Sequence, residues 1–339
     1  MKSREETEAL PPASFSCDNA APKIGDQNMN IRIISISAVI ALPLLFITAR
    51  PQPAIAHPQT SQDKSTGGCW TYPDSLDALI ADPQNHTVVY DDANVQLLDV
   101  HTPPGTTNSL HDHHWSSVFV NIEAQPRGRD HKADGSVTQP GGVVPADALF
   151  PLLNVAGPQG PHAYENLDTF TKHFYRLQFK KVPFRCPQEF NGQFQDNARR
   201  SAVTTLPPVE IADWIWPVSM EQVATSPQTD KVLADNADFR FIEVTIPPGR
   251  KQNMGTHQLP SALFFFEVQP KGTDMFSDAP SEGIIGKDTQ FRLVNRSFED
   301  AVFPTAIRMG PQPPHSFENT DTIPAHYYRM EFKKIKYKG

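Results

Sequence analysis

The chain has 339 residues with 38% hydrophobic and 20% charged residues, and its formal net charge is −8. This length allows two ordinary domains with cores of their own. The acidic balance argues against nucleic acid as a partner, because nucleic-acid-binding proteins present a basic face. The 33 prolines and 21 phenylalanines favour short strands joined by turns over long helices.

A secretory signal peptide is predicted at residues 29–56, at the end of a leader that comprises residues 1–56. Arg32 precedes an apolar run, and small residues close the segment in the sequence PQPAIA. Met29 is a natural start for this signal. An uncleaved anchor is the alternative, but Pro43 interrupts the apolar run. We therefore expect cleavage after residue 56, a periplasmic or secreted protein, and no membrane association of the mature chain.

Export would place the cysteines of the mature chain in an oxidising compartment. Cys17 lies in the leader, so Cys69 and Cys186 are the cysteines of the mature chain. Two cysteines in an oxidising compartment can pair, and two free buried thiols are the alternative. We predict a Cys69–Cys186 disulfide that closes the first of two domains and adds about 2–4 kcal/mol to its stability.

An internal repeat organises the rest of the chain. WTYPDS at Trp70 and WIWPVS at Trp214 begin two copies that keep one offset of 144 residues through QPRGRD and QPKGTD. Beyond an insertion in the second copy the offset is 153, where GPQGPHAYENLDT at Gly157 matches GPQPPHSFENTDT at Gly310. The copies end in HFYRLQFKKV and HYYRMEFKKI. The repeat is too long for a solenoid unit, so each copy is predicted to be a domain.

Each copy is predicted to be all-β. We place the N-terminal domain at residues 57–182, a linker at 183–213 and the C-terminal domain at 214–339. Short capped helices are expected at residues 75–81 and 219–224. Runs such as VQLLDVHT, SSVFVNIEA and YRLQFKKV are typical of strands bounded by turn residues. This pattern favours a β-sandwich, jelly roll or barrel in each copy.

The HDHH stretch is the first candidate site. In a strand, residues two apart face the same side. His111 and His113 are therefore expected to point into the interior, whereas Asp112 and His114 point outward, with His114 at the surface. A hydrogen-bonded polar interior without metal is the alternative use of such a pair.

A third histidine is expected to join this pair. His162 is the obvious donor, because the second copy also has a histidine, His315, in the same setting. Three neutral imidazoles suit Fe, Mn, Zn, Cu or Ni, and the ligands do not choose among them. Open coordination positions would accept water or substrate.

The order PPG-x5-His-x-His resembles the first cupin motif, G-x5-H-x-H-x3,4-E-x6-G. Gly105, His111 and His113 match it, but Ser117 and Val118 stand where the glutamate ligand falls. The resemblance therefore implies a three-histidine site and not the site with three histidines and a glutamate.

GPQGPHAYEN is similar to the second cupin motif, P-x-G-x2-H-x3-N. Pro158, Gly160, His162 and Asn166 match, with one residue fewer before the histidine. Both repeats are covered, so the chain resembles a duplicated cupin, or bicupin. The implied fold is two tandem double-stranded β-helix (jelly-roll) domains.

The second copy is weaker as a metal site. His111 aligns with Gly255, and the histidines that remain are His257 and His315. Two histidines make a poor site, so we interpret them as a vestigial second site, metal-free or adventitiously loaded.

The remaining signals are pocket residues and repeated histidines. Trp115, Ser117, Tyr164 and Asn166 are candidates to line the pocket, although aromatic residues in a barrel often serve as core. One further histidine stands at the start of the last strand in each copy. We interpret both of these residues, His173 and His326, as structural.

The predicted function is an exported bicupin whose N-terminal domain holds a divalent metal and acts on or binds a small molecule. Dioxygenase-type chemistry is one possibility that the resemblance implies, and no catalytic residue is identified. Non-enzymatic ligand binding or sensing, a structural role without metal and metal-free acid–base chemistry stay open. We expect no nucleotide cofactor. Exposed strands in cupins often pair between subunits, so a homo-oligomer also stays open.

Overall fold

The computed structural model describes residues 70–183, 186, 192–196, 216–277, 291–296 and 302–335. The predicted leader, Cys69 and most of the predicted linker lie outside these residues, so the signal peptide and the Cys69–Cys186 disulfide stay predictions. Within the described part of the chain, no helix combines the length and the hydrophobicity that crossing a membrane requires.

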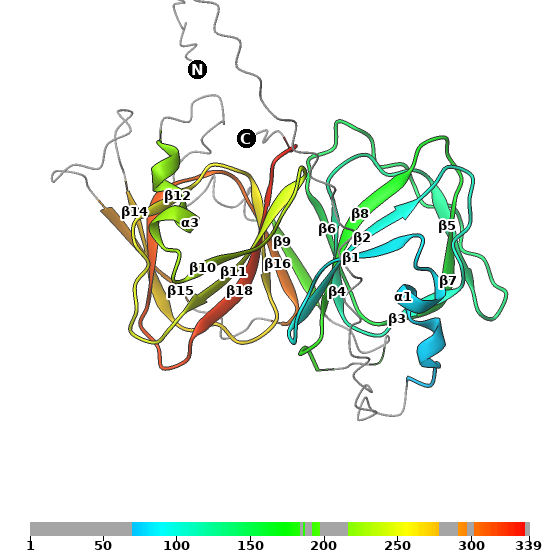
Figure 1. The fold of residues 1–339 in the computed structure, drawn as a ribbon, viewed down its shortest axis with the longest axis horizontal. Coiled ribbons are helices and arrows are strands. Elements are labelled where there is room, and N and C mark those ends of the chain that lie inside the picture. Colours follow the sequence, from blue (N-terminus) through cyan, green and yellow to red (C-terminus); the bar gives the residue numbers. More distant parts are fainter. Residues whose placement is uncertain are drawn as a thin grey trace, which may run out of the picture. The chain divides into compact units, whose positions relative to one another are not determined.

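Eight strands of the first repeat curl into one barrel (Figure 1). They form a five-stranded sheet in the order β1-β2-β8-β4-β6 and a three-stranded sheet in the order β3-β7-β5. The strands are β1 (His86–Asp91), β2 (Val95–Thr102), β3 (His111–His113), β4 (Ser117–Asn121), β5 (Gly128–Lys132), β6 (Leu152–Ala156), β7 (Gln159–Asn166) and β8 (Lys172–Phe179).

The second repeat forms a barrel with the same strand order. Its sheets run β10-β11-β18-β13-β16-β9 and β12-β17-β14-β15. Two of these strands, β9 and β15, extend the sheets beyond the pattern of the first barrel, and β9 comes from the segment predicted as linker. The strands are β9 (Gln193–Asp196), β10 (Asp230–Asp235), β11 (Phe239–Ile246), β12 (Gly255–His257), β13 (Ser261–Phe265), β14 (Gly272–Ser277), β15 (Phe291–Arg296), β16 (Thr305–Met309), β17 (Gln312–Asn319) and β18 (Ala325–Phe332).

The helices are short and sit at the start of each repeat. They are η2 (Asp74–Leu76), α1 (Ala78–Ala81), η5 (Val218–Met220) and α3 (Gln222–Thr225). Asp77 caps α1, because its carboxylate accepts a hydrogen bond of 2.9 Å from the Leu79 N–H. The expected short helices are therefore present in both copies.

Asp77 also pairs with Asp112 of β3 in an isolated β-bridge, so the segment before β1 covers the outer face of β3. Asp112 is 2% exposed and His114 is 7% exposed as a result. The prediction that His114 lies at the surface is wrong, because the strand period gives the side of a strand but not what covers that side.

Strand β2 has buried residues on both faces, and its apolar side chains divide between two cores. Leu98 and Val100 belong to the core inside the first barrel. Val95 and Leu97 belong to a second core that also contains residues of the other barrel. Tyr175 of β8 contributes to this shared core with its ring 4.7 Å from that of Phe239, measured between centroids. One outer sheet face of each barrel is thus covered by the other.

Candidate metal centre

The first barrel encloses a cavity of about 380 Å³ between its two sheets. Its walls combine imidazoles, cationic side chains and apolar residues. Four histidines line it: His86, His111, His113 and His162. The site is therefore built from both sheets of the barrel.

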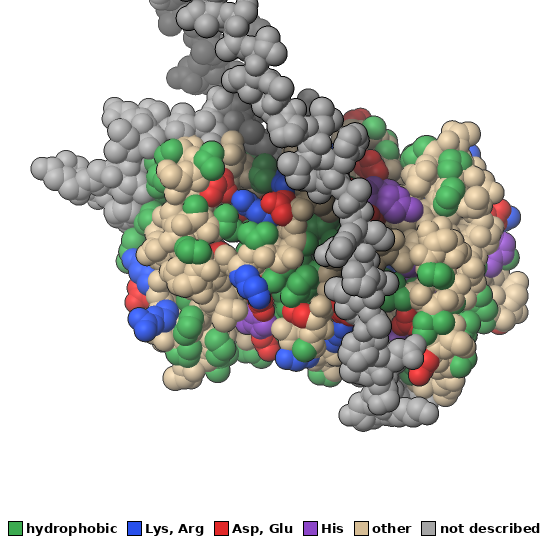
Figure 2. Space-filling model, in the orientation of Figure 1, with side chains coloured by type: hydrophobic (Ala, Val, Ile, Leu, Met, Phe, Trp, Pro, Cys, Tyr) green, Lys and Arg blue, Asp and Glu red, His purple; other side chains and the backbone are tan. Residues whose placement is uncertain are grey.

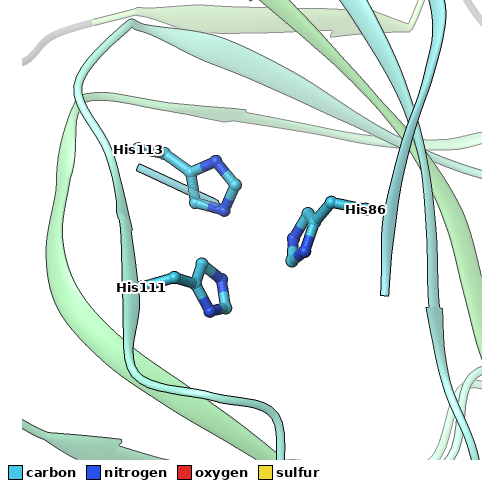
Figure 3. A group of neighbouring side chains, drawn as sticks. All are labelled: His86, His111 and His113. Atoms are coloured by element: carbon cyan, nitrogen blue, oxygen red, sulfur yellow. The ribbon is translucent and has the colours of Figure 1, made fainter. Parts of the chain in front are cut away.

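Three of these histidines face one another (Figure 3). His86 begins β1, whereas His111 and His113 lie on β3 and point to the same side. One ring nitrogen from each residue can be chosen so that all three lie within 4.8 Å of one another. All three residues are buried, so the described structure holds a compact group of imidazole nitrogens in the cavity wall.

His162 stands beside this group. Strand β7 pairs with β3, and His162 lies directly opposite His111 in the register. The centroid of its ring is 4.7 Å from that of His111 and 5.8 Å from that of His113. The predicted residues His111, His113 and His162 thus come together, and His86 adds a fourth imidazole.

Backbone carbonyls fix the protonation of these rings. His111 Nδ1 lies 2.8 Å from the Ser109 carbonyl oxygen, and His162 Nδ1 lies 3.0 Å from that of Gly160. Because a carbonyl only accepts hydrogen bonds, each Nδ1 carries the proton and each Nε2 keeps a lone pair. Such partners orient metal-binding imidazoles in proteins.

His86 is held by Asp82. Its Nδ1 lies 3.2 Å from the backbone carbonyl oxygen of Asp82 and 3.2 Å from the carboxylate Oδ2. Burial alone would raise the pKa of Asp82, but hydrogen bonds with His86, Asn85 and the Ser109 N–H lower it. Asp82 is therefore a buried carboxylate that orients the His86 ring and leaves its Nε2 available.

His111, His113 and His162 are neutral at neutral pH. Burial lowers the pKa of His111 to about 4 and that of His162 to about 3. Burial, together with the charge of Arg176, also lowers the pKa of His113 far below its usual range. Neutral imidazole is the form that binds a metal ion.

Arg176 of β8 gives the cavity a fixed positive charge. Its side chain is buried, with its Cζ 4.6 Å from the centroid of the Phe119 ring, and Nη1 donates a hydrogen bond to Gln159 Oε1. Nε and Nη2 have no hydrogen-bond partner among the described residues. Burial lowers the pKa of Arg176 only to about 9, so the guanidinium stays charged at neutral pH.

Lys172, at the start of β8, is a second cation in the cavity wall. Its Nζ lies 3.2 Å from the centroid of the Tyr164 ring, which is a cation–π contact. Burial lowers the pKa of Lys172 to about 8. Asp130 is a carboxylate in the same wall, and the charge of Arg129 is balanced by an ion pair with Glu165. The two cations, Arg176 and Lys172, outnumber the single carboxylate, so the charge of the cavity suits an anion.

The second barrel has a smaller cavity, of about 50 Å³, lined by His257 and His315 among others. Their ring centroids lie 5.3 Å apart. His257 Nδ1 lies 2.6 Å from Glu331 Oε1, within a buried network that includes Arg240 and Arg329. In the described residues of this barrel, no group of ligand atoms comes together as in the first.

Gly255 explains why the second barrel differs. It occupies the place of His111, and a Cβ there would overlap the side-chain oxygen of Gln222. Gln222 of α3 occupies the place of Ala78 of α1. The first barrel thus pairs Ala78 with His111, whereas the second pairs Gln222 with Gly255. Atoms of Gln222 therefore fill this part of the second site.

Both halves therefore share one plan, in which the two histidine-bearing segments lie on paired strands of the smaller sheet, β3 with β7 and β12 with β17. Two facing sheets of five and three strands with this order form a double-stranded β-helix. The chain has a bicupin fold.

No family model and no curated protein sequence matches the chain. A cupin domain from Bordetella pertussis Tohama I is similar to it at 18% identity over 28% of this chain and 91% of that one, with a TM-score of 0.23. Oxalate decarboxylase from Lactobacillus farciminis, in a formate complex, has 14% identity over 74% and 82%, with a TM-score of 0.23. AerE from Microcystis aeruginosa has 10% identity over 74% and 97%, with a TM-score of 0.23. The assignment of the bicupin fold rests on the strand order and the duplicated motifs of this chain.

The other predicted pocket residues lie in different places. Tyr164 lines the cavity of the first barrel. Trp115 packs against the His114 ring, with centroids 4.3 Å apart, and is not among the lining residues. Ser117 is fully buried in the sheet. Asn166 donates hydrogen bonds to two backbone carbonyls, those of Thr102 and Phe170, at 2.9 Å each. Asn166 thus joins neighbouring segments of the fold.

His86 was missed at the sequence level. It precedes TVVYD in an ordinary strand pattern and belongs to neither cupin motif. Its counterpart in the second copy is Asp230, so the repeat does not mark the position as a histidine. One signal was available, because Asp230 is also a residue type that binds metals.

Proposed function

We propose that the N-terminal barrel of this bicupin binds a divalent transition metal and acts on a small anionic molecule in the adjoining cavity. The observation that carries this proposal is the group of buried imidazoles from His86, His111 and His113, whose nitrogens lie within 4.8 Å of one another. His162, next to them, is the proposed fourth ligand.

The donor set fits such an ion. Imidazole nitrogens bind Fe, Mn, Zn, Cu and Ni, with bond lengths of about 2.0–2.1 Å for zinc. Two ligands of one ion therefore lie at most about 4 Å apart, and small ring rotations bring the observed group into range. When bound, the ion would supply Lewis-acid or oxygen chemistry at its open positions.

The residues around the site favour an anion as its ligand. Nε and Nη2 of Arg176 are buried without hydrogen-bond partners among the described residues, and an unpaired buried donor is costly. These two N–H groups lie on the same edge of a guanidinium and can donate to both oxygens of one carboxylate. Lys172 adds a second positive charge to the wall. We therefore propose a small carboxylate as the substrate class.

Metal content tests the proposal. The protein is purified without a histidine tag or added metal, and bound metal is measured by elemental analysis before and after titration with each divalent ion. We expect about one tightly bound equivalent that is lost in His86→Ala and kept in His257→Ala, a control at a buried histidine of the second barrel. A protein that holds well under one equivalent and gains none on titration would end the metal proposal.

We also propose that the protein is exported, on the strength of the signal-like segment at residues 29–56. Mass spectrometry of the mature chain should find His57 at its N-terminus and no free thiol before reduction, because Cys69 and Cys186 pair. An intact leader would contradict export, and two free thiols would contradict the disulfide.

A further inference from the structure

A second group of metal-binding side chains lies on the outer face of the first barrel. Asp99 and His101 are two residues apart on β2 and so face the same side, and His101 lies opposite His173 of β8. Their ligand atoms lie within 4.8 Å of one another. Val95 and Leu97, on the same face of β2, pack in the core shared with the second barrel. This group is therefore separate from the cavity inside the barrel.

Both imidazoles of the group approach one carboxylate oxygen. His101 Nε2 lies 2.7 Å from Asp99 Oδ1, and His173 Nε2 lies 3.1 Å from the same oxygen. The two rings are stacked, with centroids 4.1 Å apart and planes 9° apart. Asp99 Oδ1 and His173 Nε2 are nevertheless buried atoms without an aligned hydrogen bond among the described residues. Two imidazole nitrogens and one carboxylate oxygen thus meet at one point.

Glu123 defines the state of His173. Its Oε1 lies 2.8 Å from His173 Nδ1, and an ionised carboxylate only accepts hydrogen bonds, so Nδ1 carries a proton. Burial lowers the pKa of His173, but hydrogen bonds with Asp99 and Glu123 raise it above its usual value. The metal-free site thus favours a proton on Nε2 between His173 and Asp99, and a metal ion would take the place of that proton. A carboxylate behind a histidine is also the arrangement that orients metal ligands.

We infer that Asp99, His101 and His173 form a second, partly exposed site for a divalent transition metal such as Zn²⁺. Two imidazoles and one carboxylate suit this class of ion, and the carboxylate supplies a negative charge. The side chain of His101 is 44% exposed and that of Asp99 is 26% exposed, so an ion can reach them from solvent. A tilt of the exposed His101 ring out of the stack would bring both Nε2 atoms towards one ion.

The second barrel provides an internal comparison. His326 lies 3.0 Å from Glu243 through Nε2 and 3.0 Å from Glu267 through Nδ1, and both contacts are hydrogen bonds. Thr245 stands at the position of His101. The carboxylate–histidine–carboxylate arrangement therefore recurs as a structural element, and His101 is the added ligand in the first barrel.

Zn²⁺ titration calorimetry on the tag-free, metal-depleted protein tests the inference. The background is His111→Ala/His113→Ala, which removes the proposed cavity ligands, so the outcome does not depend on the proposed function. We expect this chain to bind one Zn²⁺. Adding His101→Thr, which copies the second barrel, should weaken binding at least tenfold. Titration with Co²⁺ should show visible absorption bands that the same substitution removes.

Thermal unfolding and circular dichroism check that each variant is folded. His326→Ala is the matched control and should leave Zn²⁺ affinity unchanged. The inference is overturned if the double variant binds no Zn²⁺, or if His101→Thr leaves its affinity unchanged. A different result would show that only the proposed cavity site fails. In that case the single variant His101→Thr, with His111 and His113 intact, would bind no metal.

Discussion

His86 and His111 belong to different sheets, yet the centroids of their rings lie 4.6 Å apart. Both rings also approach one carboxylate, because Asp82 Oδ2 lies 3.2 Å from His86 Nδ1 and 3.8 Å from His111 Nδ1. Asp82 is fully buried and accepts a hydrogen bond of 3.1 Å from the Ser109 N–H. One buried carboxylate thus lies beside imidazoles from both sheets.

Asp82→Asn should weaken metal binding. The amide keeps the size of the side chain but removes the charge that orients and polarises the imidazoles, and loss of such a partner typically costs about 10–100-fold in metal affinity. Competition with a chelator of known affinity measures the change. Asp230→Asn in the second barrel is the control and should leave the affinity as it was. Equal affinity of Asp82→Asn and the unaltered protein would show that Asp82 has only a packing role.

Arg176→Gln should weaken the binding of small carboxylates such as acetate or malonate. A hydrogen bond to a charged group contributes about 1.5–3 kcal/mol, so the dissociation constant should rise about tenfold or more. Calorimetric titration of metal-loaded and metal-free protein measures this change in each form. Arg329→Gln in the second barrel is the control, since Arg329 is engaged with Glu331 and Gln312. Unchanged carboxylate affinity in Arg176→Gln would contradict the proposed anion site.

The metal-free protein should lose stability in mild acid. The pKa of His111 is about 4 in the folded protein and near its usual 6.5 in the unfolded chain. Between these pH values the unfolded chain binds the proton more readily than the folded protein does. The contribution of His111 to the free energy of unfolding is therefore fully present above about pH 6.5 and falls as the pH drops towards 4. His111 alone should remove about 2 kcal/mol between about pH 7.5 and pH 5.

Urea unfolding at several pH values, in the presence of a chelator, measures this loss. His111→Gln has no titrating imidazole at this position, so its stability should depend less steeply on pH. A flat stability profile of the unaltered protein between these pH values would show that His111 is not held neutral.

Gly255→Ala should destabilise the second barrel. The added methyl group would overlap Gln222 and lie 2.6 Å from Thr225 Oγ1. Gln222 cannot move without losing its hydrogen bonds to Ser226 Oγ, at 3.0 Å, and to the Asn253 carbonyl, at 3.2 Å. Overpacking of this kind costs about 1–3 kcal/mol. Denaturant unfolding measures the change, and the metal content of the first barrel should not change.

Gly142→Ala is the matched control for this substitution, because a Cβ at Gly142 meets nothing within 4 Å. Its stability should change by less than about 0.5 kcal/mol. If the two alanine variants unfold alike, Gln222 does not fill the place of the missing histidine.

The repeat in the sequence predicted much of the fold. Strands at equivalent positions of the two copies begin at the constant offsets found in the sequence, from His86 and Asp230 at the start of β1 and β10 to Lys172 and Ala325 at the start of β8 and β18. Strand period and turn residues are local properties, so duplicated sequence produced duplicated strands. The same period placed His111 and His113 on one side of β3.

Only the tertiary structure decided which groups meet across the sheets. His86 reaches the site because β1 and β3 come from separate sheets that face each other in the barrel, and no local pattern encodes that approach. The burial of His114 and the gathering of Asp99, His101 and His173 have the same origin, since each depends on a segment distant in sequence. By itself, the sequence determined the strands and the sides on which their residues lie; the packing of sheet on sheet determined the neighbours of those residues.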